Sequence, residues 1–381
     1  LAAVSIIVFN ANTNAPVGVP AGSGIDGSYR IELPPGTYFL KLARQGYEDV
    51  PPRDIRPLPL NVSSGQTVTY SVQMFPNAIP NAGIVSGRVF TAGAPAPGVL
   101  VIADDSTRAY SSVSSGDGSF YIFNTPTGAY RVKAWRTGFS STDSLVAVPA
   151  GREVTTNVTL TQGVTGSVQG QVTFLATTNI EVDVELTHPR TRETIPGLST
   201  KTLSRNYILN NVPPGTYLAR ATYENDGKVV DPDWIIKNGE PLVTVGSGTV
   251  SRDFSVTGAV TLVSPTNPET STQPVDVQGA RPTFSWAAYS SADHYVVEVI
   301  NSSGRAIWGG FANNWTVRRV LVPRPQTSIQ YNADTSATEP LGVGRIYRWK
   351  IYASKNDNSE PTGWKLISAS EDQRGLIRIV P

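Results

Sequence analysis

The feature that most constrains this chain is a short series of turn and aromatic residues that occurs three times. The series reads D-G-S-Y/F, then P-x-G-x-Y, then G-Y/F, and its copies lie about 90 residues apart. Strings that recur in the same order at near-constant spacing predict copies of one small domain. They stand at residues 26–29, 34–38 and 46–47, again at 117–120, 126–130 and 138–139, and in a degenerate third copy at 206–208 and 213–217.

Each copy has the chemistry of two strands joined by tight turns. The Asp-Gly pair supplies the positive φ of a hairpin, and Tyr29, Ile31 and Leu33 then alternate with polar residues. This period of two predicts antiparallel strands with one buried face. A set of glycines closes the second reversal, where we expect a positive φ and a cost of about 1 kcal/mol for alanine. These structural turn glycines are Gly36, Gly128 and Gly215.

The repeats, together with a preceding G-x-V strand, resemble carboxypeptidase regulatory-like domains of prealbumin-type fold. The G-x-V element is Gly87-Arg88-Val89 in the second copy and Gly170-Gln171-Val172 in the third. The third copy departs from the pattern, because Ser204-Arg205-Asn206 stands in place of Asp-Gly. The resemblance implies a β-sandwich that serves as a spacer or adhesive module on exported bacterial proteins, and it implies no catalytic residues.

The last third of the chain follows a different pattern. The strings at 282–286, 292–299 and 344–353 resemble a bacterial fibronectin type III module, in which Phe284 and Trp286 share one face of a strand. We therefore expect an all-β fold, a tandem array of antiparallel β-sandwich domains. The predicted domains are 1–79, with its first strand missing, 80–163, the degenerate 164–258, and the fibronectin-like 259–381.

Composition supports this reading and excludes several functions. The 34 Gly and 29 Pro favour β-structure with turns, and a net charge of +1 gives no electrostatic reason for nucleic acid or an anionic membrane as a partner. The absence of cysteine excludes disulfides and thiolate metal sites. No apolar run is long enough to span a bilayer. The first residues are typical of a mature end after removal of an export signal, so we expect an extracellular or cell-surface protein.

Residues suited to catalysis are scarce. The chain has two histidines, His188 and His294, and neither accompanies a nucleophile elbow. We therefore expect no enzyme, no catalytic or cofactor-binding residues, no metal and no cofactor. The acidic pairs at 104–105, 224–226 and 231–233 could form a calcium loop, although solvated surface loops are the favoured interpretation.

Five of the seven tryptophans lie in the last domain. Trp308, Trp315 and Trp364 stand among turn residues, so they form a candidate aromatic binding surface for glycans or a protein. The alternative is that these rings cap the ends of the sandwich.

The first copy lacks the G-x-V strand that opens the other two. It begins directly at an apolar strand, so we expect Val4, Ile6 and Val8 to form an unpaired interface edge. A strand from a neighbouring subunit or partner would complete the domain and build a polymer; alternatively, the strand is simply absent from this chain. The C-terminal strand at 375–380 is one possible donor, although the last domain needs it.

The predicted function is that of a non-enzymatic extracellular structural or assembly protein. It would act as a spacer, coat or filament subunit at a prokaryotic cell surface, with other protein subunits as partners. The alternative is a carbohydrate-binding or adhesive accessory module of a larger secreted protein.

Overall fold

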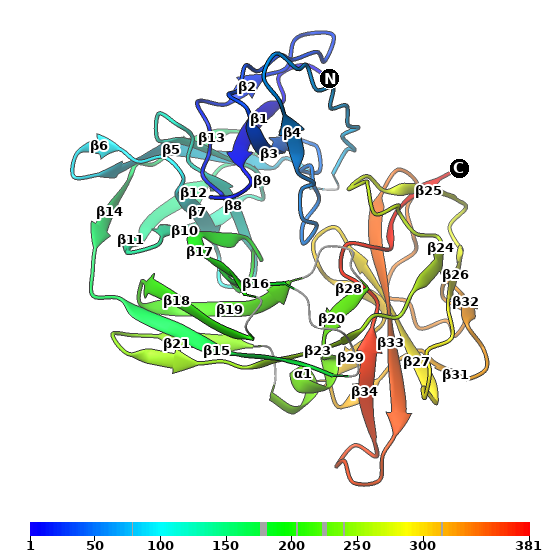
Figure 1. The fold of residues 1–381 in the computed structure, drawn as a ribbon. Helices are drawn as coiled ribbons and strands as arrows, with labels where there is room; N and C mark the ends of the chain where they lie inside the picture. Colours follow the sequence, from blue (N-terminus) through cyan, green and yellow to red (C-terminus); the bar gives the residue numbers. More distant parts are fainter. Residues whose placement is uncertain (78, 176–180, 203–204, 223–226, 239–240, 314) are drawn as a thin grey trace.

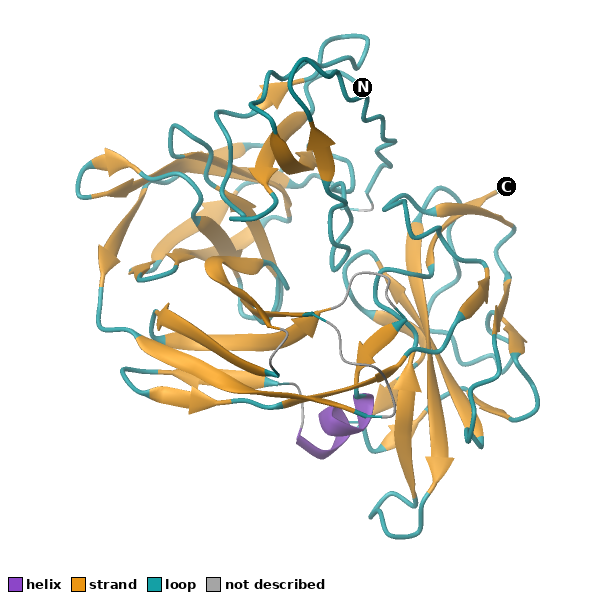
Figure 2. Ribbon diagram, viewed as in Figure 1, coloured by secondary structure: helices purple, strands orange, loops and turns teal. Residues whose placement is uncertain are grey.

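The computed structural model describes residues 1–381 except 78, 176–180, 203–204, 223–226, 239–240 and 314. The described part consists of strands and loops with one short helix (Figure 2). The predicted all-β fold of antiparallel sandwiches is therefore confirmed. Below, residues 1–79, 80–163, 164–258 and 259–381 are called the first to fourth units.

The first unit has one regular sheet of four strands in the order β2-β1-β3-β4. Strand β1 pairs with β3 antiparallel over its full length, from Ser5 opposite Ala43 to Asn10 opposite Tyr38. Its apolar face packs on Tyr38, Leu40 and Leu42, as their alternation in the sequence predicts. The strands are β1 (Ser5–Asn10), β2 (Ala21–Gly22), β3 (Gly36–Ala43) and β4 (Leu60–Val62).

The second unit has two layers that are joined through β14, which pairs with both β5 and β11. Its core lies between the layers and includes Val85, Val89, Phe120, Tyr130 and Val158. The strands are β5 (Gly83–Thr91), β6 (Ala94–Pro95), β7 (Leu100–Asp104), β8 (Ala109–Val113), β9 (Ser119–Thr125), β10 (Gly128–Arg136), β11 (Phe139–Ser141), β12 (Ser144–Val148), β13 (Glu153–Thr155) and β14 (Val158–Gln162).

The third unit repeats this plan with two separate sheets, β18-β15-β23-β20 with β22 beside β15, and β17-β16-β19-β21. The elements are β15 (Gly166–Phe174), β16 (Val182–Thr187), β17 (Thr194–Thr202), β18 (Asn206–Val212), β19 (Gly215–Thr222), β20 (Lys228–Val230), α1 (Pro232–Asn238), β21 (Leu242–Val245), β22 (Thr249–Ser251) and β23 (Phe254–Gly258).

The fourth unit packs the sheet β24-β26-β32 on the sheet β25-β35-β33-β27-β28. Phe284 and Trp349 lie at its centre with their rings 4.8 Å apart. The strands are β24 (Leu262–Ser264), β25 (Val275–Gln278), β26 (Thr283–Trp286), β27 (His294–Asn301), β28 (Ala306–Gly309), β29 (Phe311–Ala312), β30 (Val317–Arg318), β31 (Leu321–Pro323), β32 (Ser328–Gln330), β33 (Ile346–Asn356), β34 (Trp364–Ala369) and β35 (Leu376–Val380).

The units do not extend along a line. Strand β7 is buried on both faces, because Leu100 and Ile102 belong to the core of the third unit while Val101 and Ala103 belong to that of the second. The first and fourth units also meet, since the backbone N–H of Arg56 donates to the side chain of Gln373 at 2.8 Å. The chain therefore returns on itself, with both termini at the same end of the molecule (Figure 1).

The turn glycines have a different structural reason from the predicted one. Gly36, Gly128 and Gly215 each begin a strand, and none has a positive φ, so that expectation was wrong. Instead, the tyrosine two residues later folds back over each glycine, and its hydroxyl donates to a proline carbonyl four residues upstream of itself. A Cβ atom at these positions would lie 3.0, 3.4 and 3.3 Å, respectively, from the tyrosine side chain. The hydroxyl bonds run from Tyr38 to Pro34, from Tyr130 to Pro126 and from Tyr217 to Pro213.

Candidate functional site

The second layer of the first unit contains two extended segments with an empty strand position between them. Residues 28–33 and 67–74 form no regular strand pairs, although the structure describes every residue from 1 to 77. We call the position between these segments the strand slot. The single contact that the structure gives across it is a hydrogen bond from the Tyr29 hydroxyl to the Tyr70 carbonyl at 2.7 Å.

Both segments alternate between half-buried apolar and exposed polar side chains, as strands do. The half-buried residues pack on the core of the first unit but remain more accessible than their counterparts in the second unit. There, Phe120, Ile122, Val158 and Leu160 are each at most 2% exposed. The half-buried set of the first unit comprises Tyr29, Ile31 and Leu33 from one segment and Tyr70, Val72 and Met74 from the other.

The second and third units show what occupies the corresponding position in their own sheets. In the second unit, β5 pairs antiparallel with β9 and parallel with β13 and β14. In the third unit, β15 pairs antiparallel with β18 and parallel with β22 and β23. These are the G-x-V strands identified in the sequence. Within residues 1–77, no strand occupies the corresponding position between 28–33 and 67–74. One of these segments also contacts the fourth unit, because the backbone N–H of Gln73 donates to the Gln273 side chain at 3.0 Å.

The slot has the width of one strand. In the third unit, the Tyr207 hydroxyl donates to the Arg252 carbonyl, and Gly170 of β15 lies against both groups. Tyr29 and Tyr70 occupy the same places in the repeat and make the same bond without a strand beside it. Burial raises the pKa of Tyr29, with a smaller contribution from Tyr70, so the hydroxyl stays protonated and able to donate. The flanks are thus held at the spacing that a strand requires.

The prediction that Val4, Ile6 and Val8 form an unpaired edge was wrong. Val4, Ile6 and Val8 are at most 4% exposed, and β1 is paired on both sides, with β3 and, at Ser5 and Ile6, with β2. They are core residues and do not form an edge. The G-x-V strand precedes the apolar strand in sequence but lies in the opposite layer, so its absence opens the layer that contains Tyr29 and Tyr70.

The proposed C-terminal donor is already in use. Strand β35 lies between β25 and β33, and Leu376, Ile377 and Ile379 are buried in the fourth unit. Releasing this strand would expose the core of that unit.

Two of the three candidate binding tryptophans are buried, which corrects the expectation of an exposed surface. Trp308 is 2% exposed and donates its indole N–H to Asp334 at 2.7 Å, and Trp364 is 5% exposed. Trp315 is half-buried and stacks on Phe311 with a centroid distance of 4.5 Å. The rings fill the interior and one end of the sandwich, and they do not present three faces to solvent.

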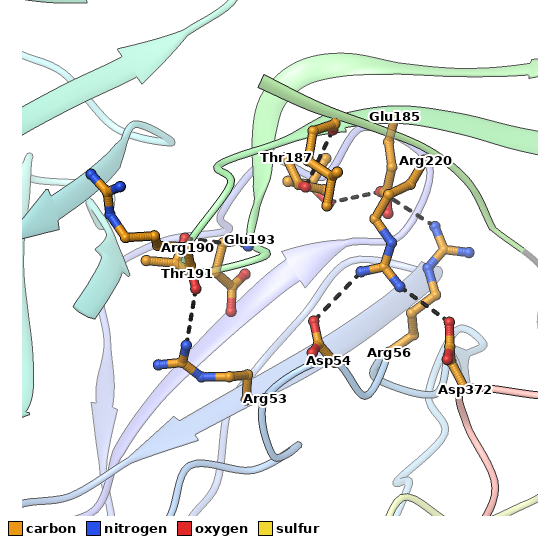
Figure 3. Close-up of polar contacts among 12 residues, drawn as sticks. Arg53, Asp54, Arg56, Glu185, Thr187, Arg190, Thr191, Glu193, Arg220 and Asp372 are labelled. Carbon is orange, nitrogen blue, oxygen red and sulfur yellow. Dashed lines mark hydrogen bonds and ion pairs between the residues drawn. The ribbon is translucent and has the colours of Figure 1, made fainter. Parts of the chain in front are cut away.

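A second notable region is a charged junction where the first, third and fourth units meet. Asp54 pairs with Arg220 at 3.5 Å, and Arg220 also pairs with Asp372 at 3.4 Å (Figure 3). Asp54 pairs with Arg348 as well, at 3.4 Å. Arg56 pairs with Asp183 at 3.1 Å. The groups come from elements far apart in the sequence, so the repeat pattern gave no signal for them.

Electrostatics at the junction favour the ionised carboxylates. Burial by itself raises the pKa of Asp54, but the guanidinium groups of Arg348 and Arg220 outweigh it and hold the pKa below its usual value. Asp372 behaves in the same way: burial opposes ionisation, and Lys350 and the same two arginines lower its pKa. The junction therefore locks three units together through compensated charges.

The junction surrounds a cavity of about 730 Å³ that is lined by all four units. Asp49 and Arg53 reach it from the first unit, Tyr110 from the second, Glu193 from the third and Tyr352 from the fourth. Arg53 donates to the Arg190 carbonyl at 3.0 Å (Figure 3). The wall of the cavity is thus built from contacts between units.

Most of the titratable groups singled out in the sequence are engaged in structural contacts. His294 differs, because its buried Nδ1 has no hydrogen-bond partner among the described residues. His188 lies 3.7 Å from Asp104, and burial lowers its pKa to about 4 despite that carboxylate. Asp104 also pairs with Arg190, Asp105 with Arg108, and Asp233 with Lys237. Residues 224–226 lie outside the described part. Across the described residues, no three His, Cys, Asp or Glu side chains come close enough together to hold a metal ion.

Residues 84–161 match the family model of the carboxypeptidase regulatory-like domain. This confirms the predicted resemblance for the second copy. A search of curated proteins found no match. None of the helical segments in the described chain has the length and apolar character needed to cross a bilayer.

Solved structures with detectable similarity include three bacterial proteins. The minor pilin GBS52 of Streptococcus agalactiae is 15% identical over 48% of this chain and 99% of its own, with a TM-score of 0.23. The Bacillus anthracis TIE protein is 12% identical over 100% of this chain and 67% of its own, with a TM-score of 0.20. The shaft pilin SpaA of Lactobacillus rhamnosus GG is 12% identical over 47% and 98%, with a TM-score of 0.18. Similarity at this level carries no argument about function.

Proposed function

We propose that this chain is a non-enzymatic structural subunit of an extracellular or cell-surface assembly, which polymerises when a strand of a neighbouring protein fills the strand slot of the first unit. The observation that carries the proposal is the slot itself. Its two flanks retain strand alternation and spacing but have no strand between them, whereas both related units have one. Addition of a strand to open backbone groups is a general mode of protein association.

The arrangement of the units favours a coat or filament subunit over an extended spacer. A spacer separates its ends, but here the first and fourth units are joined by the junction around Asp54 and by the Arg56–Gln373 contact. A compact body with one open slot accepts a strand from a neighbouring subunit, and repeated contacts of this head-to-tail kind generate rings or filaments.

The division into four domains at 79, 163 and 258 is part of the same proposal. Its support is that each unit has sheets of its own, although the second and third share a continuous apolar contact. We further propose that the fourth unit is fibronectin type III-like. Support comes from its three-stranded sheet β24-β26-β32, which packs on the sheet containing β27, β28, β33 and β35.

The test fills the strand slot covalently, with an N-terminal extension of this chain that contains a copy of β5. Residues 83–98 of the second unit, which contain β5 and its connection, are placed directly ahead of Val4. The matched control carries the same extension with valine at the position of Gly87, whose Cβ the unit cannot accommodate. Light scattering and negative-stain electron microscopy then report on assembly over a range of protein concentrations.

The expected result is assembly of the unmodified chain and of the control when cell-surface extract supplies the donor strand, and a monomer when the slot is filled. Hydrogen exchange at 28–33 verifies that the extension occupies the slot. A monomeric unmodified chain at every concentration, alone and with cell-surface extract, would contradict the proposal. Assembly that persists unchanged in the slot-filled variant would do so as well.

A further inference from the structure

We infer that the cavity between the four units binds a short neutral oligosaccharide, with sugar rings on the aromatic side chains of its wall and hydroxyl groups on Asp49 and Arg53. The inference does not depend on the strand addition proposed above. It is drawn from the side chains that line the cavity. The volume of about 730 Å³ lies within the range of about 300–1,000 Å³ that is usual for ligand sites.

One side of the cavity is the outer face of the sheet in the first unit. Phe39 of β3 alternates with the core residues Tyr38 and Leu40, so its ring points away from the core of that unit. The ring is half-buried and stacks on Phe9 with a centroid distance of 5.0 Å and an interplanar angle of 9°. Both phenylalanines line the cavity. The first unit therefore contributes a flat aromatic face to the wall.

The second unit contributes another aromatic face. Tyr121 and Phe123 of β9 point away from the core of their unit, which is entered by Ile122 between them. Both residues line the same cavity, and their rings stack with a centroid distance of 6.1 Å. Tyr121 is 44% exposed, so its ring is accessible to a ligand. Flat aromatic faces of this kind pack on the C–H groups of sugar rings.

Asp49 adds a carboxyl group to the outer face of the first unit. Val50 beside it is a core residue that bridges Leu42 in antiparallel register, so the Asp49 side chain points to the outer face. The carboxyl is accessible from the cavity, and none of the described residues forms a hydrogen bond or ion pair with it. Burial between the units raises its pKa to about 7, with smaller contributions from Glu48 and Glu193. Near neutral pH this group can therefore donate a hydrogen bond as well as accept one.

Arg53 supplies hydrogen-bond donors near this carboxyl. Its positive charge acts on Asp49, and its guanidinium group donates to the carbonyls of Arg190 and Ala109 at 3.0 and 3.3 Å. A guanidinium group has five N–H donors. The others have no acceptor within the part of the chain that the structure describes, so they are available to a ligand.

The other charges on the wall favour a neutral ligand, because many of them pair with one another. A charged ligand would have to displace an existing ion pair. An apolar ligand would remove water from Asp49 and Arg53 without replacing its hydrogen bonds. A sugar avoids both costs, because each ring has apolar C–H faces and polar hydroxyl edges. The ion pairs on the wall include Lys41 with Glu193, Arg56 with Asp183, and Arg220 with Asp54.

The test measures binding of neutral trisaccharides to the complete 381-residue chain by isothermal titration calorimetry. The probes are maltotriose, cellotriose, mannotriose and triacetylchitotriose, with indole as the apolar comparison. Tyr121→Ala removes the accessible ring, and Asp49→Ala removes the carboxyl. Leu145→Ala is the matched control, because this side chain is 78% exposed and does not line the cavity. Hydrogen exchange of the unmodified chain, with and without saccharide, locates the bound probe without any substitution.

At least one trisaccharide is expected to bind more tightly than indole and to protect amides at 119–123 and 48–53. Tyr121→Ala and Asp49→Ala should each lower its affinity about tenfold, whereas Leu145→Ala should leave it within about twofold. Several results would overturn the inference: no saturable binding of any trisaccharide at millimolar concentration, tighter binding of indole, protection outside the cavity, or unchanged affinity in both cavity variants.

Discussion

Replacing Gly87 with alanine should disrupt the second unit far more than the same change at Gly128. Both glycines lie in strands of one unit, and Gly128 has no positive φ that would penalise alanine. They differ in the space available for a Cβ. At Gly87 the nearest atom is the Thr156 carbonyl oxygen at 1.8 Å, whereas at Gly128 it is the Tyr130 ring at 3.4 Å.

The magnitude follows from these two distances. An ordinary carbon–oxygen contact is about 3.2 Å, so alanine at 87 forces β5 and its neighbour apart by more than about 1 Å, at a cost of roughly 2 kcal/mol or more. At 128 the ring contact is already of ordinary length. The lower backbone entropy of unfolded alanine then offsets any tightening, and the net change stays within about 1 kcal/mol.

Hydrogen exchange in the complete chain measures this difference locally. A loss of about 2 kcal/mol lowers the protection of amides in β9 and β14 about thirtyfold in Gly87→Ala, because 1.4 kcal/mol corresponds to a factor of ten. Gly128→Ala should stay within about fivefold of the unmodified chain. If Gly87→Ala retained full protection in both strands, the steric argument for glycine at this position of β5 would be refuted.

Three further predictions concern the contacts between and within units. Asp54→Ala leaves two arginines that are 21% and 13% exposed without their shared carboxylate, so the first unit should loosen by about 2–4 kcal/mol, visible as faster exchange at 51–57. Because the pKa of Asp54 is lowered on folding, its stabilisation is present above about pH 4 and is lost as the pH falls further, which a pH series of the same measurement would show. His188 should titrate near pH 4 by NMR, and since its folded pKa is below its unfolded value, protein stability should fall as the pH drops from about 6.5 towards 4. Tyr217→Phe removes the hydroxyl bond to Pro213 and should cost about 1 kcal/mol in the third unit, with an unchanged melting temperature counting against a role for that bond.

Local chemistry in the sequence was sufficient for most of the strands, the repeats and the class of fold, although 28–33 and 67–74 alternate like strands and form no regular strand pairs. Turn residues and a period of two in apolar side chains act over a few residues, so the alternation alone assigns Tyr29, Ile31 and Leu33 to one face. The repeat also shows that residues 1–79 contain no counterpart of the G-x-V strand, because that observation needs only a comparison of three segments of one chain.

The tertiary structure decided which layer the missing strand leaves open. Sequence neighbours need not share a sheet in a sandwich, so the order of the strands in the chain suggests an edge at Val4, Ile6 and Val8, although they are paired on both sides. Likewise, turn residues around Trp308 suggested exposure, but the indole is covered by strands that are distant in sequence.

Contacts between units could not be predicted from the sequence for the same reason. Asp54, Arg220, Arg348 and Asp372 are unremarkable surface types in their own segments, and only the closure of the chain brings them together. Periodicity fixes which side of a strand a residue faces. What lies on that side is set by long-range packing. For the first unit, the comparison with β5 and β15 shows which strand position is unoccupied within the described residues.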